Sequence, residues 1–509
     1  MLWSAEPVRV PCDTGRVTDA AREVKIKMMN RSDSRRALKR IATGVLFLVA
    51  TTTGYAEEAG MSPEKQLTFS PKNHDLDNND NFSSDGRYLC YDTREMYGSS
   101  IDNSTSIELL ELETGREIVL YRPEHVVLGD APAPGVGAVS FNPARPEVAF
   151  IHGPMPEEVA WRGPYGKPNR CGALVPVDGE ITRVGDEWRM LKDGKQSLFW
   201  LDCRDIARDR PTRPGAHRGG THRHEFSRDG QRVGFTYDDF LLPRYDRTIG
   251  YLEFHPRAPE PARCWFAVLV RPVPMGESRP GEIEKAYGDS WVDPRGTLRA
   301  FIGKVRNDDG VTYEESLFVA EIPDSVDITT ADPGDAERYP SPPQGIKIRR
   351  VTHEWAGGIV RGAPDGSRIA YLGRDATGKQ QVYVVDAWGS DQAEDPTMRP
   401  AQVSRVEGGV TGDIRWHPSG KAVLFTADGG IAAVSLEGPL PGETVWLTPH
   451  GDGEPRHAVV ISPDGRLVVY NRIVPTTDEY GNRVQTWSGK DCKQIFSVAW
   501  PGKTAGLPE

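Results

Sequence analysis

Phe226-Ser-Arg-Asp-Gly230, followed by Gln231-Arg-Val-Gly-Phe-Thr-Tyr237, is the stretch that decides the fold of this chain. Its first part is a turn of the Ser-Pro-Asp-Gly type, in which Asp bonds its own backbone and Gly adopts positive φ. Its second part alternates with a period of two residues. That alternation predicts a β-strand with one face packed on a neighbouring sheet.

Six further copies of this motif occur, so the unit repeats along the chain. They begin at Phe82, Phe141 (a degenerate copy), Trp291, Gly362, Trp416 and Ile461. A second hairpin and a third strand follow each turn, and several repeats end in a fourth strand, as at 349–354 and 445–450. Repeats of four antiparallel strands without helical periodicity predict an all-β propeller. We expect seven blades, and because one copy is degenerate, a six-bladed propeller stays an alternative.

The repeats define one domain, residues 57–509, because a four-stranded sheet buries both faces only when blades stack around an axis. The segment 64–69 precedes the first motif, whereas the last repeat ends without a fourth strand. We therefore predict that 64–69 completes the last blade and closes the ring, which removes exposed edge strands. Residues 153–217 form the longest gap between motifs, and we expect an insertion there on the rim.

The first 56 residues are predicted to be a signal peptide, with residues 1–27 interpreted as a start-site artefact. A basic stretch that includes Arg35, Arg36 and Lys39 precedes the apolar run 41–50, and small residues follow up to Ala56. That run is too short to span a bilayer stably. The expected location is therefore periplasmic or secreted, with no stable membrane anchor after cleavage.

Charge and cysteine content narrow the partners and cofactors. The net charge is −11, which disfavours nucleic acid as a partner. The cysteine spacings match no zinc motif. A disulfide between Cys171 and Cys203, which flank the long insertion, is the expected pair in an oxidising compartment. Cys90 lies in an apolar strand and is expected to be a buried free thiol.

The repeats resemble the TolB-type, WD40-like propeller repeat over nearly all of residues 64–500. The stretches AFIHGP (149–154), RGGTHRHEFSRDGQRVGFTYDD (218–239) and EIEKAYGDSWV (282–292) resemble more specifically the YidR-like bacterial proteins. The resemblance implies the TolB-like fold but no established activity. It also implies binding of a saccharide, a peptide or an envelope protein at the mouth of the channel.

Alignment of the seven motifs places two columns of residues, four and two positions before each turn, on the innermost strands. Alternation predicts that both columns face the same side of the strand, toward one end of the channel. A polar sector in an otherwise apolar ring indicates a ligand pocket. Its members are Asn78, Asp80, His222, His224, Tyr287, Asp289 and His457.

His222 and His224 can share a divalent ion, with Asp80 or His457 as further ligands. The alternative is that both histidines hydrogen-bond backbone or acidic groups at a blade junction. The stretch THRHEFSRDG loosely resembles oligogalacturonate lyases, which implies manganese and β-elimination on uronates. In that alternative Arg218 or Arg223 neutralises the uronate carboxylate, and one of the two histidines takes the α-proton.

Asp75-Leu-Asp-Asn-Asn-Asp80 begins like a calcium loop but lacks the glycine and the glutamate that an EF-hand requires. The pattern excludes an EF-hand and leaves an irregular calcium site open, beside a polar Asx-rich turn. Between the two functions, the sequence favours ligand binding over a metal-dependent lyase.

Overall fold

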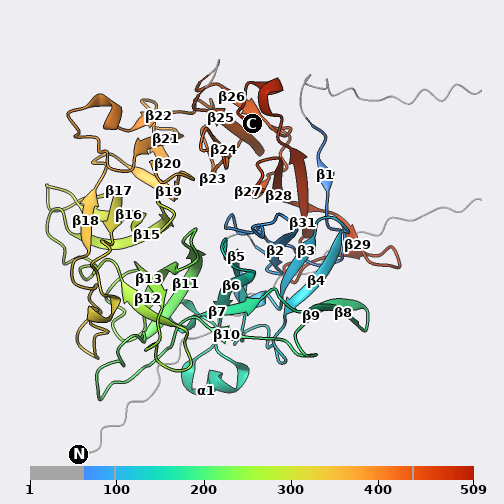
Figure 1. The fold of residues 1–509 in the computed structure, drawn as a ribbon, viewed down its shortest axis with the longest axis horizontal. Coiled ribbons are helices and arrows are strands. Elements are labelled where there is room, and N and C mark those ends of the chain that lie inside the picture. The colour runs from blue at the N-terminus through green and yellow to red at the C-terminus, as the bar shows by residue number, and fades with distance from the viewer. Residues whose placement is uncertain (1–61, 97–98, 438–440) are drawn as a thin grey trace, which may run out of the picture. The chain divides into compact units, whose positions relative to one another are not determined.

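Seven β-sheets are arranged as blades around a central axis (Figure 1). The computed structural model describes residues 62–96, 99–437 and 441–509, and all blades belong to one unit, 57–509. The seven sheets confirm the predicted seven-bladed, all-β propeller and exclude six blades. The predicted signal peptide lies outside the described residues. No helix within the described ranges is long and apolar enough to cross a membrane.

The blades are numbered here in the order of their motif turns, and their strands are given in the order of pairing. Blade 1 holds β2 (Tyr88–Asp92), β3 (Ile107–Glu111), β4 (Arg116–Tyr121), β9 (Glu187–Leu191) and β8 (Glu180–Val184). Blade 2 holds β5 (Val136–Phe141), β6 (Glu147–His152), β7 (Cys171–Pro176) and β10 (Phe199–Trp200). Blade 3 holds β11 (Gly219–Phe226), β12 (Arg232–Asp239), β13 (Thr248–Phe254) and β14 (Cys264–Val268). Blade 4 holds β15 (Ile283–Trp291), β16 (Leu298–Arg306), β17 (Tyr313–Glu321) and β18 (Lys347–Arg350).

The remaining blades follow the same plan. Blade 5 holds β19 (Ala356–Gly362), β20 (Arg368–Arg374), β21 (Gln380–Asp386) and β22 (Ala401–Gln402). Blade 6 holds β23 (Gly412–Trp416), β24 (Ala422–Ala427), β25 (Gly430–Ser435) and β26 (Thr444–Trp446). Blade 7 holds β27 (His457–Ile461), β28 (Leu467–Val474), β31 (Cys492–Ala499) and β1 (Lys65–Gln66). Outside the blades lie the hairpin of β29 (Thr476–Thr477) and β30 (Arg483–Val484) and the short helix α1 (Val159–Arg162).

The motif turn forms as its sequence predicts. In blade 3, Asp229 Oδ1 accepts hydrogen bonds from Ser227 Oγ at 2.6 Å and from the backbone N–H of Gln231 at 3.0 Å. Gly230 has a φ of 67°, which favours glycine at this position. In blade 3, hydrogen bonds within the turn itself thus connect the innermost strand, β11, to the second strand, β12.

The ring closes through β1, which precedes the first motif yet pairs antiparallel with β31 of the last repeat, with Lys65 opposite Ser497. This confirms the predicted closure by residues 64–69. Just before β1, Glu64 accepts hydrogen bonds from Arg456 Nε at 3.0 Å and Nη2 at 2.9 Å. The N-terminal strand and the last motif are thus joined by backbone and side-chain bonds.

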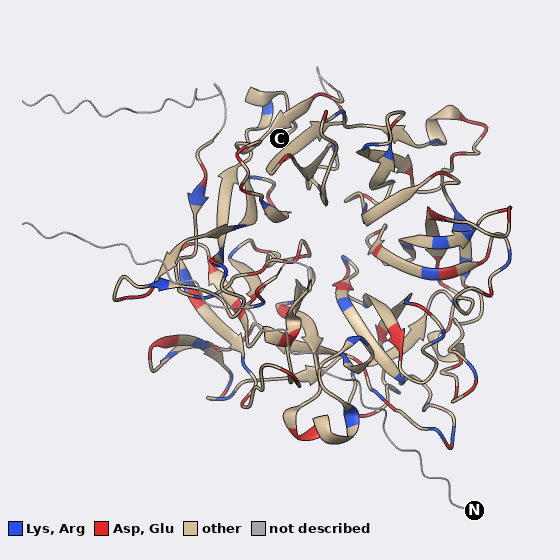
Figure 2. Ribbon diagram, turned by 180° about the vertical axis from the view of Figure 1, so that it is seen from behind, with Lys and Arg blue, Asp and Glu red and all other residues tan. Residues whose placement is uncertain are grey.

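The hydrophobic core is divided among the blade junctions. Seven large apolar clusters each combine side chains of two neighbouring blades, including the pair formed by blades 7 and 1. Between blades 2 and 3, for example, Ala149 and Leu174 pack with Val233 and Phe235. Charged residues of both signs are distributed around the ring (Figure 2). Stability therefore comes from face-to-face stacking of sheets.

Residues 153–217 contain regular blade structure as well as additional elements. β7 and β10 are the third and fourth strands of blade 2, while β8 and β9 form a hairpin that pairs in parallel with β4 of blade 1. Blade 1 in turn lacks a regular innermost strand and has single bridges instead, such as Asp75 with Asp92. The hairpin accordingly extends blade 1 at its outer edge.

The expected disulfide between Cys171 and Cys203 is wrong. Both are buried free thiols with different neighbours. Cys171 Sγ lies 3.2 Å from Arg162 Nη2, whereas Cys203 Sγ lies 3.0 Å from Arg213 Nη2. Cys90 is a buried free thiol, as predicted.

Candidate functional site

A β-bulge interrupts the innermost strand of six blades just before the motif turn. In blade 3, His222 lies opposite Thr236 and Glu225 lies opposite Gly234, so the chain accommodates one extra residue. Arg223, within the bulge, has a φ of 59°. An extra residue moves the following side chains to the other face of the strand. The alternation from which the channel-facing columns were predicted is therefore broken.

Blade 1 has no such bulge among its described residues, and its residues 77–81 instead extend toward the centre of the ring, where they contact other blades. Asn78 donates through Nδ2 to the carbonyl of Val459 in blade 7 at 2.7 Å, and Asn79 donates to the carbonyl of His224 in blade 3 at 3.2 Å. Arg361 of blade 5 donates through Nη2 to Asn78 O at 2.5 Å and to Asn78 Oδ1 at 2.8 Å. The segment 77–81, the channel loop, thus ties together blades that are not neighbours.

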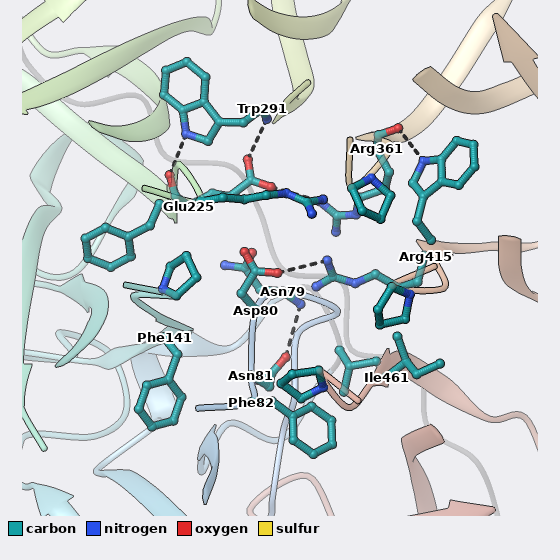
Figure 3. A pocket seen from close by; sticks show the side chains of 18 of the residues that line it. Asn79, Asp80, Asn81, Phe82, Phe141, Glu225, Trp291, Arg361, Arg415 and Ile461 are labelled. Carbon is teal, nitrogen blue, oxygen red and sulfur yellow. Dashed lines mark hydrogen bonds and ion pairs between the residues drawn. The ribbon is translucent and has the colours of Figure 1, made fainter. Parts of the chain in front are cut away.

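A cavity of about 380 Å³ lies over the channel loop, at the end of the channel that carries the motif turns (Figure 3). Its wall alternates between aromatic or proline residues of the turns and the polar residues that precede each turn. The polar residues of the lining are Asn79, Asp80, Asn81, Ser84, Glu225, Arg228, Ser290, Arg361 and Arg415.

Two arginines and an aspartate cross the cavity. Arg415 Nη1 lies 3.3 Å from Asp80 Oδ1, while Arg415 Nε and Nη2 are buried without a hydrogen-bond acceptor. Arg361 Nη1 is also buried without one, 3.5 Å from Glu225 Oε1. Burial, with Arg415 and Arg223 close by, holds the pKa of Arg361 well below its ordinary value. The two guanidinium groups thus offer more hydrogen-bond donors than the surrounding residues accept.

Glu225 is fully engaged by its neighbours. It accepts hydrogen bonds from Ser290 Oγ at 2.6 Å, from the backbone N–H of Trp291 at 3.2 Å and from Arg299 Nη1 at 3.1 Å. Burial alone raises the pKa of Glu225, but Arg299 and Arg361 outweigh it and leave the pKa lowered. Glu225 is therefore ionised and already neutralised.

Arg228 completes the charged lining. It is exposed at the cavity and, among the described residues, it has no hydrogen-bond or ion-pair partner. Three guanidinium groups thus face two carboxylates, those of Asp80 and Glu225, and both carboxylates are already paired.

Of the residues predicted from the sequence, Asp80 lines this cavity, and its side chain is 41% exposed. Asn78 lies below it, fully buried in the hydrogen bonds of the channel loop. Arg223 donates through Nη2 to the carbonyl of Asn78 at 3.2 Å. The binding roles predicted for these residues stay predictions.

His222 and His224 are not among the residues that line the cavity. His222 Nδ1 lies 3.2 Å from Thr236 Oγ1, and desolvation lowers its pKa well below the ordinary value. His224 is fully buried, with Nε2 at 3.1 Å from Thr221 Oγ1 and 3.9 Å from Asp202 Oδ2. The His222 contact lies within blade 3, between β11 and β12, whereas His224 reaches Asp202 at the junction of blades 2 and 3. Neither contact tests a metal role of the pair.

The other predicted residues have separate surroundings. Asp289 is buried and accepts from Arg299 Nε at 2.7 Å, and Tyr287 donates its hydroxyl to Glu315. Arg218 is fully buried and donates through Nε to Asp239 Oδ2 at 2.9 Å. Burial lowers the pKa of His457. None of these four residues is among those that line the cavity, and the binding and catalytic roles predicted for them stay predictions.

The aspartates of the calcium-like pattern are held by cations of the chain itself. Arg94 lies 3.5 Å from Asp75 Oδ1 and 3.2 Å from Asp77 Oδ1, and Lys493 also binds Asp75. The pattern forms a polar turn, in which Asp77 and Asn78 adopt positive φ.

One group of metal-type side chains is present within the described residues. Cys171 Sγ, a carboxylate oxygen of Asp202 and a ring nitrogen of His217 lie within 4.8 Å of one another, all buried. None of the three was predicted as a site residue, because they come from separate segments with no metal-binding spacing.

The sequence analysis also missed Glu225, Arg361 and Arg415. A signal was present: the position directly before the motif is polar in six of the repeats, as Asn81, Ser140, Glu225, Ser290, Arg361 and Arg415. The bulge itself is marked by residues that tolerate positive φ, such as Gly288 and Asp413.

Comparison with known proteins finds one matching family model, similar solved structures and a curated relative. Residues 135–253 match the model of a protein family of unknown function, DUF3748. In the solved structures, the chain is similar to an oligogalacturonate lyase of Vibrio parahaemolyticus, with 10% identity and a TM-score of 0.47, over 87% of this chain and 94% of the other. A candidate TolB protein of Agrobacterium tumefaciens has 14% identity and a TM-score of 0.29, over 55% of this chain and 90% of the other.

A curated relative has much higher identity. It is the uncharacterized protein YidR of Escherichia coli strain K12, which is 31% identical over 438 residues, corresponding to 80% of this chain and 94% of the relative. The chain therefore belongs to the YidR family of β-propellers.

Proposed function

We propose that this chain is an exported propeller that binds a carboxylate-bearing ligand, a saccharide or a peptide, in the cavity above the channel loop. The observation that carries the proposal is the charge balance of the lining. Arg228, Arg361 and Arg415 face only two carboxylates, both already paired, in a chain whose net charge is −11. Local positive charge in an acidic protein attracts an anion.

The donors suit a carboxylate. A guanidinium binds a carboxylate through two parallel hydrogen bonds from one edge of its fork. Arg415 engages Asp80 through Nη1, which leaves the edge of Nε and Nη2 without an acceptor. Unsatisfied buried donors cost about 1–3 kcal/mol each, so a ligand oxygen reaching them after a side-chain adjustment is favoured. Arg228 is the exposed arginine of the lining, so a ligand that enters from solvent would contact it first.

Binding without turnover is favoured over the lyase alternative, because no histidine lines the cavity among the described residues. The lyase alternative, with manganese or calcium on His222, His224, Asp80 or His457, stays a prediction. The binding proposal requires no metal.

Export is part of the proposal and rests on the basic and apolar stretches that end near Ala56. It places the cavity in the periplasm or the medium, where an acidic saccharide, a peptide or an envelope protein with an exposed carboxylate is the ligand class. Mass spectrometry of the exported protein should then give a chain that begins just after residue 56.

Isothermal titration with oligogalacturonate and with an acidic peptide, each beside its neutral methyl ester, tests the ligand class. The acids should bind and the esters should not. Arg415→Gln should weaken binding about ten- to hundred-fold, the loss expected for a charge-assisted pair. Arg466→Gln is the matched control, because Arg466 is exposed and does not line the cavity.

The same samples, followed by ultraviolet absorbance for unsaturated products, test turnover. Binding without product supports the proposal, whereas product formation favours the lyase alternative. Equal affinity for acids and esters, or unchanged affinity in Arg415→Gln, would overturn the proposed site.

A further inference from the structure

The junction of blades 2 and 3 holds a second polar cluster that is separate from the cavity. Cys171 begins β7, Asp202 follows β10 and His217 precedes β11, so three distant segments meet there. Their exposed fractions are 5%, 2% and 0%. None of the three lines the central cavity.

His217 is the unusual member. Its Nε2 lies 3.3 Å from Asp202 Oδ1, yet neither ring nitrogen has a hydrogen-bond partner within the described chain. The ring packs on Phe266, with centroids 5.3 Å apart, so water has no access to it. Buried polar groups without partners are rare in native proteins, and an ion at the site is one of the few physical explanations.

Asp202 is held in place toward His217 by surrounding donors. The backbone N–H of Gly172 donates to its two carboxylate oxygens at 3.1 and 3.0 Å, and Thr221 Oγ1 donates to Oδ2 at 2.5 Å. A Cβ at Gly172 would lie 2.7 Å from His224 Nε2, so glycine is required for this close approach. Outer partners that fix the orientation of a ligand are typical of metal sites.

We propose that Cys171, Asp202 and His217 bind one zinc ion, which holds blades 2 and 3 together. Sulfur, nitrogen and oxygen donors together suit zinc, whereas calcium takes oxygen ligands alone. Ligand atoms of a tetrahedral zinc site are about 3.3–3.8 Å apart for bonds of about 2.0–2.3 Å. The His217–Asp202 separation of 3.3 Å matches that spacing.

His224 lies beside the three ligands, with its Nε2 3.9 Å from the other oxygen of Asp202 and 3.1 Å from Thr221 Oγ1, so it is an outer neighbour of the cluster rather than one of the ligands. Arg162 Nη2 contacts Cys171 Sγ at 3.2 Å, and this cation opposes the rise in the pKa of the thiol that burial and Asp202 cause. The site is structural and independent of ligand binding in the cavity.

Metal analysis of the full chain after incubation with excess zinc and desalting tests the proposal. About one zinc per chain is expected, and Cys171→Ser and His217→Gln should each lower zinc affinity by about 100-fold or more. Cys264→Ser is the matched control, since Cys264 is an equally buried free thiol in β14 outside the cluster.

Cobalt substitution keeps the test decisive if a variant fails to fold. The unmodified protein loaded with Co²⁺ should show thiolate-to-metal charge-transfer absorption. A folded, unmodified protein that binds no zinc, or whose cobalt spectrum lacks the thiolate band, would leave only a buried ion pair and overturn the proposal. Chelation should lower the melting temperature without changing affinity for the carboxylate ligand, which separates this result from the cavity experiment.

Discussion

Asn78 of blade 1 accepts two hydrogen bonds from Arg361 of blade 5, on the far side of the channel. The two blades are not neighbours, so this pair joins parts of the ring that share no sheet interface. Asn78 adopts a φ of 47°, which asparagine tolerates better than most residues. The channel loop is therefore both the floor of the cavity and a brace across the ring.

Replacement of Asn78 by Ala should destabilise the propeller by about 1–3 kcal/mol, because it leaves a buried guanidinium with one acceptor fewer and strains the positive-φ position. Urea denaturation measures the change. Asn482→Ala serves as the control, since Asn482 is exposed and should change stability by less than about 0.5 kcal/mol. Equal stability of both variants would show that the brace contributes nothing.

Replacement of Asp80 by Asn should strengthen binding of a carboxylate ligand, because Asp80 is the group that neutralises Arg415 at 3.3 Å. Its side chain is 41% exposed, so the pair is worth about 0.2–1 kcal/mol and the gain in affinity is up to about fivefold. Titration of the variant with the acidic ligand measures this. Weaker binding would mean that Asp80 contacts the ligand directly, as the sequence analysis predicted.

The fold was predictable because its determinants are local and repeated. Asp229 and Gly230 build a turn from their own chemistry, and the absent last strand implied closure by 64–69. The cavity lining was not predictable by alternation, because the bulges break the alternation: in blade 3, one inserted residue reverses the face of every side chain after it.

The cluster at the junction of blades 2 and 3 shows a second kind of site that the sequence did not predict. Cys171 and His217 come together only because β7 and β11 belong to neighbouring blades, and their separation along the chain matches no metal motif. Stacking of sheets creates such contacts without any local signature. Spacing rules find sites on one strand or one loop, and they miss sites between blades.

Replacement of Glu64 by Gln should weaken ring closure by about 1–3 kcal/mol at pH 7, since Arg456 is 1% exposed and loses one of its two carboxylate partners, the other being Asp452. Burial raises the pKa of Glu64, but hydrogen bonds from Arg456 and Tyr470 leave it lowered. An acid with a lowered native pKa stabilises above its unfolded pKa and loses that contribution as pH falls through the native one.

The difference in unfolding free energy between wild type and Glu64→Gln should thus shrink below about pH 4.5. Denaturation curves at several pH values measure it, with the exposed Glu113→Gln as the control that stays unchanged throughout. If the difference in unfolding free energy stayed the same at low pH, the ion pair between Glu64 and Arg456 would not be its cause.

Acid should destabilise the propeller through His152, which is fully buried between Tyr121 and the carbonyl of Gly153. Burial lowers the pKa of His152 to about 4 from its ordinary 6.5. Between these values the unfolded chain binds a proton and the native chain does not, so stability falls as pH decreases, by up to about 3 kcal/mol.

Urea denaturation from pH 7.5 to 4.5 should show a shallower decline for His152→Gln than for wild type, whereas the exposed His125→Gln should match wild type. Parallel curves for all three proteins would mean that His152 is protonated in the native state.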